Sequence, residues 1–161
     1  MKITIIAAGK KMPAWVYQCC DDYYQRLPAQ YQVATHEIAL EQRGKSQSTD
    51  VTRTRETQRL LQQVPANDYI IALSENGDTV STGQFAGRLD AWREQSKNIT
   101  FVIGGPDGLD FSASVNGLAR WPHWRCSLSA LTFPHPLVRV ILAEQLYRAW
   151  SVVAGHPYHR A

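Results

Sequence analysis

The C-terminal residues concentrate side chains that bind anions or exchange protons. His156, Tyr158, His159 and Arg160 all lie in the segment that closes the chain. A histidine titrates near neutral pH, a tyrosine stacks and hydrogen-bonds, and an arginine presents a planar fork to phosphate. A frayed terminus is the alternative, although Pro157 restricts how far the segment can wander. We expect this segment to reach a bound substrate.

A bare stretch of backbone follows the apolar run that ends at Ile103. Residues 104–108 read Gly-Gly-Pro-Asp-Gly, so a ligand can approach the main chain over most of the turn without meeting a Cβ. The spacing fits neither common glycine-rich phosphate motif, and Pro106 removes one N–H that an anion site would use. A ligand pocket and a simple tight turn explain the stretch equally well.

A second candidate loop spans residues 128–136 and reads Leu-Ser-Ala-Leu-Thr-Phe-Pro-His-Pro. The loop is small and largely apolar, it holds no lysine, and its backbone groups are free to hydrogen-bond. These properties suit a neutral heteroaromatic group such as adenine better than a pyrophosphate. The loop and the glycine turn together predict a pocket.

Arg139 has an anomalous position in the long helix predicted after this loop. On a helical projection it shares a face with Leu146 and Trp150. Because an unpaired buried charge is costly, its guanidinium must snorkel to the surface or find a carboxylate, a carbonyl or a ligand. Glu144 and Arg148 form an i,i+4 pair on the opposite, polar face.

Other kinds of site fit the sequence poorly. The Gly-x-Ser-x-Gly pattern of serine hydrolases is absent, and Asp107 and Asp110 flank the glycine turn, where capping of a following helix is their expected role. The remaining candidate metal ligands lack the paired spacing of zinc sites, so we expect no metal. These candidates are His123, Cys126, His156 and His159.

Strand-like runs alternate with helical patterns along the chain, which predicts an α/β fold with a mostly parallel sheet flanked by helices. The predicted strands are Ile3–Ala7, Gln32–Ile38, Tyr69–Leu73, Ile99–Ile103 and Cys126–Leu128. The predicted helices are Ala14–Arg26, Val51–Val64, Thr82–Gln95, a short one at Ser112–Ala119, and Pro136–Ala154. Ser81, with Gln84 three residues later, predicts a capping box, and Gly155 is expected to end the last helix.

Length and composition favour one domain in a reducing compartment. A chain of 161 residues, 44% of them hydrophobic, is long enough for one α/β core and too short for two, so we expect residues 1–161 to form a single domain. No apolar run has the length of a membrane helix and no signal-peptide pattern is present, which predicts a cytoplasmic protein without a membrane partner. Three cysteines without framework spacing agree with that location.

The net charge of +3 arises in the last quarter of the chain. Residues 120–161 hold five arginines, four histidines and a single acidic residue, Glu144. Arginine binds phosphate and stacks on bases, which favours RNA or another polyanion as a partner, although a solvated basic face is the plainer alternative. Arg43 and Lys45, in a polar loop over residues 41–49, are further candidates for phosphate contacts.

Four segments of the chain resemble one known family. They read KITIIAAGK, FVIGGPDGL, SLSALTFPHPLVRVILAEQLYRAW and HPYHR. These segments are similar to those of the RlmH family of small SPOUT methyltransferases, which methylate a pseudouridine of large-subunit ribosomal RNA, and the similarity spans essentially the whole chain. Residues 120–125, with two tryptophans and two arginines, depart from the family pattern. We expect these tryptophans to be packed rather than stacked on RNA.

The resemblance implies a SPOUT-type fold with a C-terminal trefoil knot, a homodimer, and S-adenosyl-L-methionine as the methyl donor. It implies that the acceptor is N3 of a pseudouridine in the 23S ribosomal RNA of the assembled large subunit or ribosome. The expected partners are therefore the ribosome and its RNA, and not DNA. The cofactor-binding residues implied by the resemblance are Leu73, Gly104, Gly105, Leu128, Ser129, Ala130, Leu131, Thr132 and Phe133.

A sulfonium donor is already activated, so the main task of such an enzyme is to hold the acceptor nitrogen in line with the methyl carbon. The imide proton must also leave, which a nearby base or cationic neighbours would assist. The candidate catalytic residues are Tyr158 and His159, with Arg139 and Arg148 as electrostatic partners. The candidate RNA-binding residues are Arg43, Lys45 and Arg160. Which group removes the proton stays open.

Two other functions compete with this one. A non-catalytic RNA-binding or ribosome-associated module would use the same basic end, and cofactor binding separates the two. A nicotinamide-dependent dehydrogenase is disfavoured, because no glycine fingerprint follows the first predicted strand.

Overall fold

The computed structural model describes residues 1–42, 48–115, 117 and 122–160. The strands are β1 (Lys2–Ala8), β2 (Gln32–Ile38), β3 (Tyr69–Thr79), β4 (Ile99–Ile103) and β5 (Trp124–Ser127). The helices are α1 (Ala14–Arg26), α2 (Thr49–Gln62), α3 (Thr82–Glu94), α4 (His135–Val153) and a short 3-10 helix, η1 (Pro157–Arg160). In the described residues the strands form one sheet of order β2-β1-β4-β3-β5, and every neighbouring pair is parallel. The predicted α/β architecture is confirmed.

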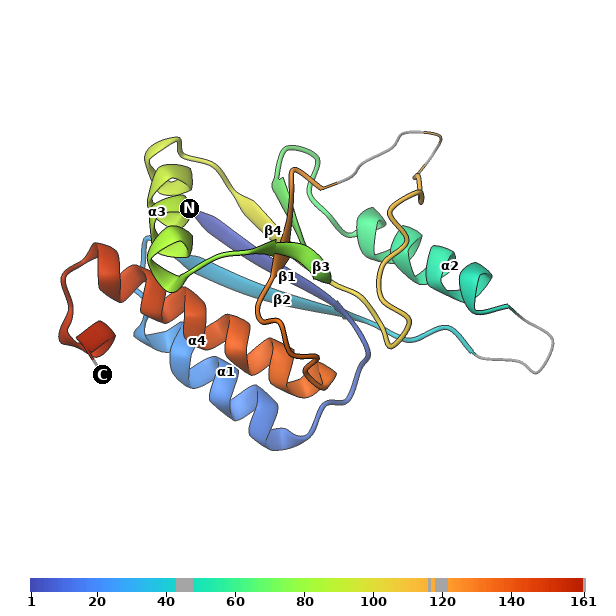
Figure 1. Ribbon diagram of the computed structural model, residues 1–161, viewed down its shortest axis with the longest axis horizontal. Coiled ribbons are helices and arrows are strands. Elements are labelled where there is room, and N and C mark those ends of the chain that lie inside the picture. The colour runs from blue at the N-terminus through green and yellow to red at the C-terminus, as the bar shows by residue number, and fades with distance from the viewer. Residues whose placement is uncertain (43–47, 116, 118–121, 161) are drawn as a thin grey trace.

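Helices cover both faces of the sheet (Figure 1). On one face, α3 and α4 pack against the odd-numbered residues of β1, such as Ile3 and Ile5. On the other face, Leu60 and Leu61 of α2 pack against Ile6. Successive residues of a strand point to opposite faces, so a strand covered on both sides reads as a continuous apolar run. This is why the strand-like runs were visible in the sequence.

β3 is longer than predicted, because the chain bulges out of the sheet and then returns to it. Both Leu73 and Asp78 align with Cys126 of β5, with residues 74–77 looped out between them. The backbones meet so closely that a Cβ on Gly77 would lie 2.7 Å from the Cys126 carbonyl carbon. The bulge projects Glu75 and Asn76 away from the sheet, beyond the point where the prediction ended the strand.

The helix predicted over Ser112–Ala119 is wrong for the residues described there, which are 112–115 and 117. The Asp110 carboxylate accepts hydrogen bonds from the Ser112 N–H at 2.8 Å and from its hydroxyl at 2.6 Å, which forms a local turn. Gly117 has φ of 75°, in the left-handed region. A side chain that bonds the backbone two residues onward competes with helix formation.

The ends of the other helices follow their sequence signals. The predicted capping box is confirmed, with Ser81 and Gln84 exchanging both hydrogen bonds at the start of α3. α4 has a proline in its first turn and stops just before Gly155, whose φ is 64°. The tail then folds back as η1, and the Tyr158 ring lies 4.7 Å from that of Tyr147.

Candidate functional site

A cavity of about 690 Å³ lies at the carboxyl ends of β3 and β4. The glycine turn, the β3 bulge, the loop before α4 and the first residues of α4 surround it. In a parallel sheet the loops after adjacent strands emerge at the same edge, which brings these distant segments together. Of the predicted cofactor-binding residues, all except Ala130 line the cavity. They are Leu73, Gly104, Gly105, Leu128, Ser129, Leu131, Thr132 and Phe133.

The two glycines after β4 are required by the packing of the turn itself. A Cβ on Gly104 would lie 2.7 Å from the carbonyl oxygen of Gly108. A Cβ on Gly105 would collide with the buried carboxylate of Glu56 on α2. Because Gly104 and Gly105 lack a Cβ, the turn can fold tightly on itself and pack against α2. The folded turn forms one wall of the cavity.

Asp110 fastens the far end of the turn to α2. Its carboxylate accepts from the Thr54 hydroxyl at 2.5 Å, and its backbone N–H donates to the Thr57 hydroxyl at 2.9 Å. Hydrogen bonds from Ser112 and then Thr54 lower the pKa of this carboxyl below its usual range. Asp110 remains ionised at neutral pH and holds the turn in place, but it caps no helix among the described residues.

The charged groups that line the described part of the cavity are mainly acidic. Glu75, Asp107 and Asp110 contribute carboxylates, and Arg53 contributes a guanidinium. Carboxylates favour a ligand that carries positive charge and disfavour a pyrophosphate.

Sequence reasoning missed His135, the first residue of α4, which also lines the cavity. Its Nε2 lies 3.2 Å from Nε and 3.1 Å from Nη2 of Arg139. Burial, and then the neighbouring guanidinium, lower the pKa of His135 to about 4, so the ring is neutral at pH 7. Its position between Pro134 and Pro136 was the available signal, because two prolines hold the backbone around a reactive side chain.

Arg139 is 5% exposed and is paired within the chain. Nη1 donates to the Glu37 carboxylate on β2, and Nη2 donates to the Gly9 carbonyl at 2.6 Å. The expectation that it needs a carboxylate or carbonyl is confirmed, and the snorkelling alternative is wrong. Arg139 lines a second cavity of about 430 Å³, together with Glu37 and Lys10, and it contacts His135, which lines the first cavity.

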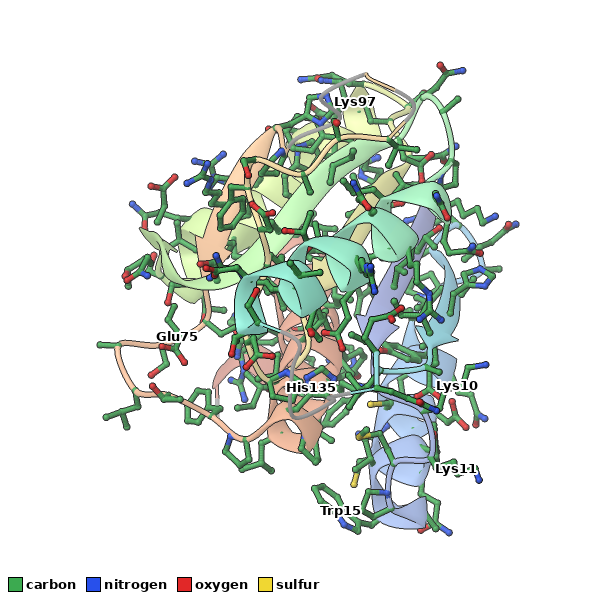
Figure 2. All side chains as sticks on the ribbon, turned by 90° about the vertical axis from the view of Figure 1, so that its right-hand side faces the viewer. Lys10, Lys11, Trp15, Glu75, Lys97 and His135 are labelled. Atoms are coloured by element: carbon green, nitrogen blue, oxygen red, sulfur yellow. The ribbon has the colours of Figure 1, made fainter. Side chains whose placement is uncertain are left out.

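Figure 2 places His135 between Glu75 on one side and Lys10 on the other. Glu75 lines the first cavity and Lys10 lines the second. Because His135 lines the first cavity, Arg139 lines the second and the two side chains are in contact, the two cavities approach each other at the start of α4.

The tail residues gather at the other end of α4. Glu144 accepts from Nε of Arg148 at 2.6 Å and from the Tyr158 hydroxyl at 3.1 Å, so the predicted Glu144–Arg148 pair is confirmed. Burial, and then the hydrogen bond with Tyr23, raise the pKa of Tyr158, which leaves its hydroxyl protonated. His159 is half-buried nearby, and its Nδ1 has no hydrogen-bond partner in the described chain.

A single chain does not bring this tail to the cavity. α4 contains 19 residues, which corresponds to a length of about 28 Å. Figure 1 shows the C-terminus beyond one end of α4, whereas the loop that lines the cavity enters α4 at the other end. The predicted RNA-binding residues Arg43 and Lys45, and the side chain of Arg160, lie outside the described part of the structure.

Two further predictions concern residues 123–126. Trp124 is 5% exposed, its indole N–H donates to Asp78 at 2.9 Å, and its ring packs near Trp92, so the prediction that it is packed is confirmed. The Nδ1 atom of His123 accepts from the Ile70 N–H at 2.8 Å. Trp121 lies outside the described residues.

Two other kinds of feature are absent from the described ranges. No three His, Cys, Asp or Glu side chains in these ranges come together in a way that could hold a metal ion. No helix in them is both long enough and apolar enough to cross a membrane.

Comparisons with known proteins show which family the chain belongs to. A family model described as a predicted SPOUT methyltransferase matches residues 1–159. Proteins named ribosomal RNA large subunit methyltransferase H are similar over their full length. The one from Thioalkalivibrio sulfidiphilus is 44% identical over 162 residues, which cover 99% of each chain. The one from Coxiella burnetii is 44% identical over 160 residues, or 99% of this chain and 100% of its own. The chain therefore belongs to the SPOUT methyltransferase family.

Proposed function

We propose that this protein transfers a methyl group from S-adenosyl-L-methionine to N3 of a pseudouridine in 23S ribosomal RNA of the assembled large subunit or ribosome. The observation that carries the proposal is the cavity formed by the glycine turn and the loop over residues 128–133. The name of the relatives, ribosomal RNA large subunit methyltransferase H, supports the RNA substrate.

The residues of the cavity suit the cofactor. A volume of about 690 Å³ accommodates a nucleoside linked to an amino acid. The backbone of residues 128–133 would hydrogen-bond the adenine, and the lining carboxylates would favour a cationic ligand. When bound, the cofactor supplies the activated methyl group. The protein's task is then to orient the acceptor base, exclude water and accommodate loss of the imide proton.

We propose that the tail completes the site of a partner subunit in a homodimer. Support comes from the lining of the cavity, which includes none of the candidate residues Tyr158, His159 and Arg148 of the same chain. Further support comes from exposed apolar side chains on the two adjacent helices α1 and α4. They are Trp15, Tyr17, Leu137 and Val153. These side chains offer apolar surface that a second copy of the chain would cover.

We also propose the C-terminal trefoil knot that is implied by the family resemblance. β5 follows β4 in the chain but pairs with β3, and β4 lies on the opposite side of β3. The chain between β4 and β5 must therefore cross from one side of β3 to the other. This connectivity supports the proposal and is compatible with threading through a loop.

Two measurements test the proposed function. Calorimetric titration with S-adenosyl-L-methionine should give saturable binding, whereas a non-catalytic ribosome-associated module would give no heat. Ribosomes from cells that lack this protein should then accept one methyl group at a pseudouridine, as read by mass spectrometry of the digested RNA. A protein that binds the cofactor but leaves these ribosomes unmodified would refute the substrate. Naked RNA should be a poor substrate, because a chain this small has little surface with which to recognise RNA alone.

We expect the protein to act in the cytoplasm, where assembled ribosomes are available.

A further inference from the structure

The contact between Arg139 and His135 has a definite chemical direction. Nε and Nη2 of Arg139 both lie within hydrogen-bonding distance of a single atom, the Nε2 of His135, at 3.2 Å and 3.1 Å. A guanidinium has only N–H donors and no acceptor. Nε2 must therefore accept, which means that it carries no hydrogen.

The tautomer of His135 follows from this constraint. A neutral imidazole with an unprotonated Nε2 carries its hydrogen on Nδ1. Nδ1 has no hydrogen-bond partner among the residues that the structure describes. Because His135 lines the first cavity, this N–H is a donor at the cavity wall that the described residues leave unused.

The guanidinium is itself held by groups from β2 and from the end of β1. Glu37 on β2 accepts from Nη1, and the carbonyls of Ala8, the last residue of β1, and of Gly9 accept from Nη2. Tyr17 on α1 donates to the same Glu37 carboxylate at 3.1 Å. A side chain fixed from this many directions has little rotational freedom, so it holds His135 in one orientation.

We propose that the Glu37–Arg139 pair is a positioning device that fixes His135 as a neutral Nδ1–H donor, which hydrogen-bonds an oxygen of the molecule bound in the first cavity. The oxygen belongs either to the carboxylate of the cofactor or to a carbonyl group of the acceptor base beside N3. In the second case the hydrogen bond stabilises the negative charge that develops on that carbonyl as the imide loses its proton. The donor keeps its own proton throughout. The identity of the ligand rests on the proposed function, whereas the tautomer does not.

Two substitutions distinguish the role of His135 as a donor into the cavity from its role as an acceptor for Arg139. In His135→Asn the amide nitrogen can occupy the place of Nδ1, so the donor survives while the acceptor for Arg139 is lost. In His135→Gln the amide can occupy the place of Nε2, so the acceptor for Arg139 survives while the cavity donor is lost. The exposed histidine of β2, changed in His36→Asn, is the control.

We expect His135→Gln to lower the rate of methyl transfer to ribosomes about a hundredfold. His135→Asn should be about tenfold faster than His135→Gln. His36→Asn should match the parent. The reverse order, with Gln more active than Asn, would show that His135 serves only to pack Arg139 and would overturn the proposal. Equal rates for the parent and His135→Gln would overturn it as well.

Binding and turnover distinguish the two sources of oxygen. If the partner is the cofactor carboxylate, His135→Gln should weaken calorimetric binding of S-adenosyl-L-methionine about tenfold or more. If the partner is the acceptor base, cofactor affinity should stay at the parent value while single-turnover transfer at saturating cofactor falls.

The positioning role of Arg139 has an independent readout that needs neither cofactor nor ribosome. In ¹⁵N NMR of the protein labelled at histidine, the His135 ring should give one protonated signal, at Nδ1, and one unprotonated signal, at Nε2. Arg139→Lys should convert this pattern into exchange between tautomers, because one ammonium cannot replace the planar fork. A parent spectrum with the hydrogen on Nε2 would refute the proposal even if the protein proved to be a methyltransferase. Failure of the parent to bind cofactor would refute the proposed function and leave the tautomer result standing.

Discussion

Gly104 and Gly108 approach each other so closely that a Cβ on Gly104 would lie 2.7 Å from the Gly108 carbonyl oxygen. The turn after β4 can close only if position 104 lacks a side chain, whereas position 108 has room for a Cβ but a φ of 76°, in the left-handed region that favours glycine. A substitution at Gly104 therefore acts on the shape of the cavity wall before it acts on any ligand.

We predict that Gly104→Val abolishes detectable binding of S-adenosyl-L-methionine and lowers the free energy of unfolding by about 1–3 kcal/mol, because the turn must open. Calorimetry and urea unfolding measure the two effects. Gly87→Ala is the matched control, since a Cβ at Gly87 in α3 meets nothing within 4 Å. It should bind cofactor normally and gain up to about 1 kcal/mol of stability. Normal binding by Gly104→Val would disprove our placement of the site.

Removal of residues 157–161 should leave cofactor affinity and dimerisation nearly unchanged, because the tail lies at the end of α4 away from its own cavity. Methyl transfer to ribosomes should fall about a hundredfold, which corresponds to about 2.7 kcal/mol of transition-state stabilisation. Stopped-time assays on ribosomes measure the rate. Parent activity in the truncated protein would identify the tail as a structural terminus. Mixing truncated chains with Gly104→Val chains should restore activity if the tail serves the partner's cavity.

The lowered pKa of His135 predicts a dependence of stability on pH. The pKa is about 4 in the folded protein and near 6.5 when the side chain is free, so the unfolded chain binds more protons between these values. The contribution of His135 to stability is fully present above about pH 6.5 and is lost as the pH falls towards 4. It amounts to at most about 3 kcal/mol. Urea unfolding at several pH values in this range gives the free energy of unfolding as a function of pH. This free energy should change less steeply with pH for His135→Gln than for the parent. Identical slopes would contradict the prediction.

The two arginine–glutamate pairs of α4 should differ in their importance for stability. Arg139 is 5% exposed and its partner Glu37 is 19% exposed, whereas Arg148 and Glu144 are 25% and 18% exposed. Glu37→Gln leaves a buried guanidinium without its counter-charge, and we expect it to cost about 3 kcal/mol. Glu144→Gln should cost about 1 kcal/mol, because water still reaches Arg148. Equal costs in urea unfolding would show that burial does not set the difference.

Much of the architecture was readable from local patterns. The continuous apolar runs of β1 and β4 and the capping box at Ser81 depend on neighbours a few residues away, so the sequence alone predicts them. The same holds for the glycine turn and the loop over residues 128–136 as candidate ligand loops. Family resemblance, rather than periodicity, supplied the reaction and the cofactor.

Where local signals competed with distant contacts, the prediction was incomplete or wrong. The helix predicted at Ser112 does not form among its described residues, because Asp110 turns the chain and is itself held by Thr54 on α2. β3 continues past Leu73 because β5, some fifty residues later, offers a second alignment with the same Cys126. Propensity within a window cannot register such partners.

The sequence by itself determined that Arg139 lies on an apolar helix face and so requires a partner, because helical periodicity and the cost of a buried charge are local facts. Only the tertiary structure decided that the partner is Glu37, about a hundred residues earlier in the chain, and that His135 shares the same guanidinium. It also decided that Tyr158 packs against Glu144, midway along α4, and does not line the cavity of its own chain. The physical reason is that the parallel sheet brings β1, β2 and the start of α4 to one edge, whereas α4 is a rigid rod that carries the tail away from that edge.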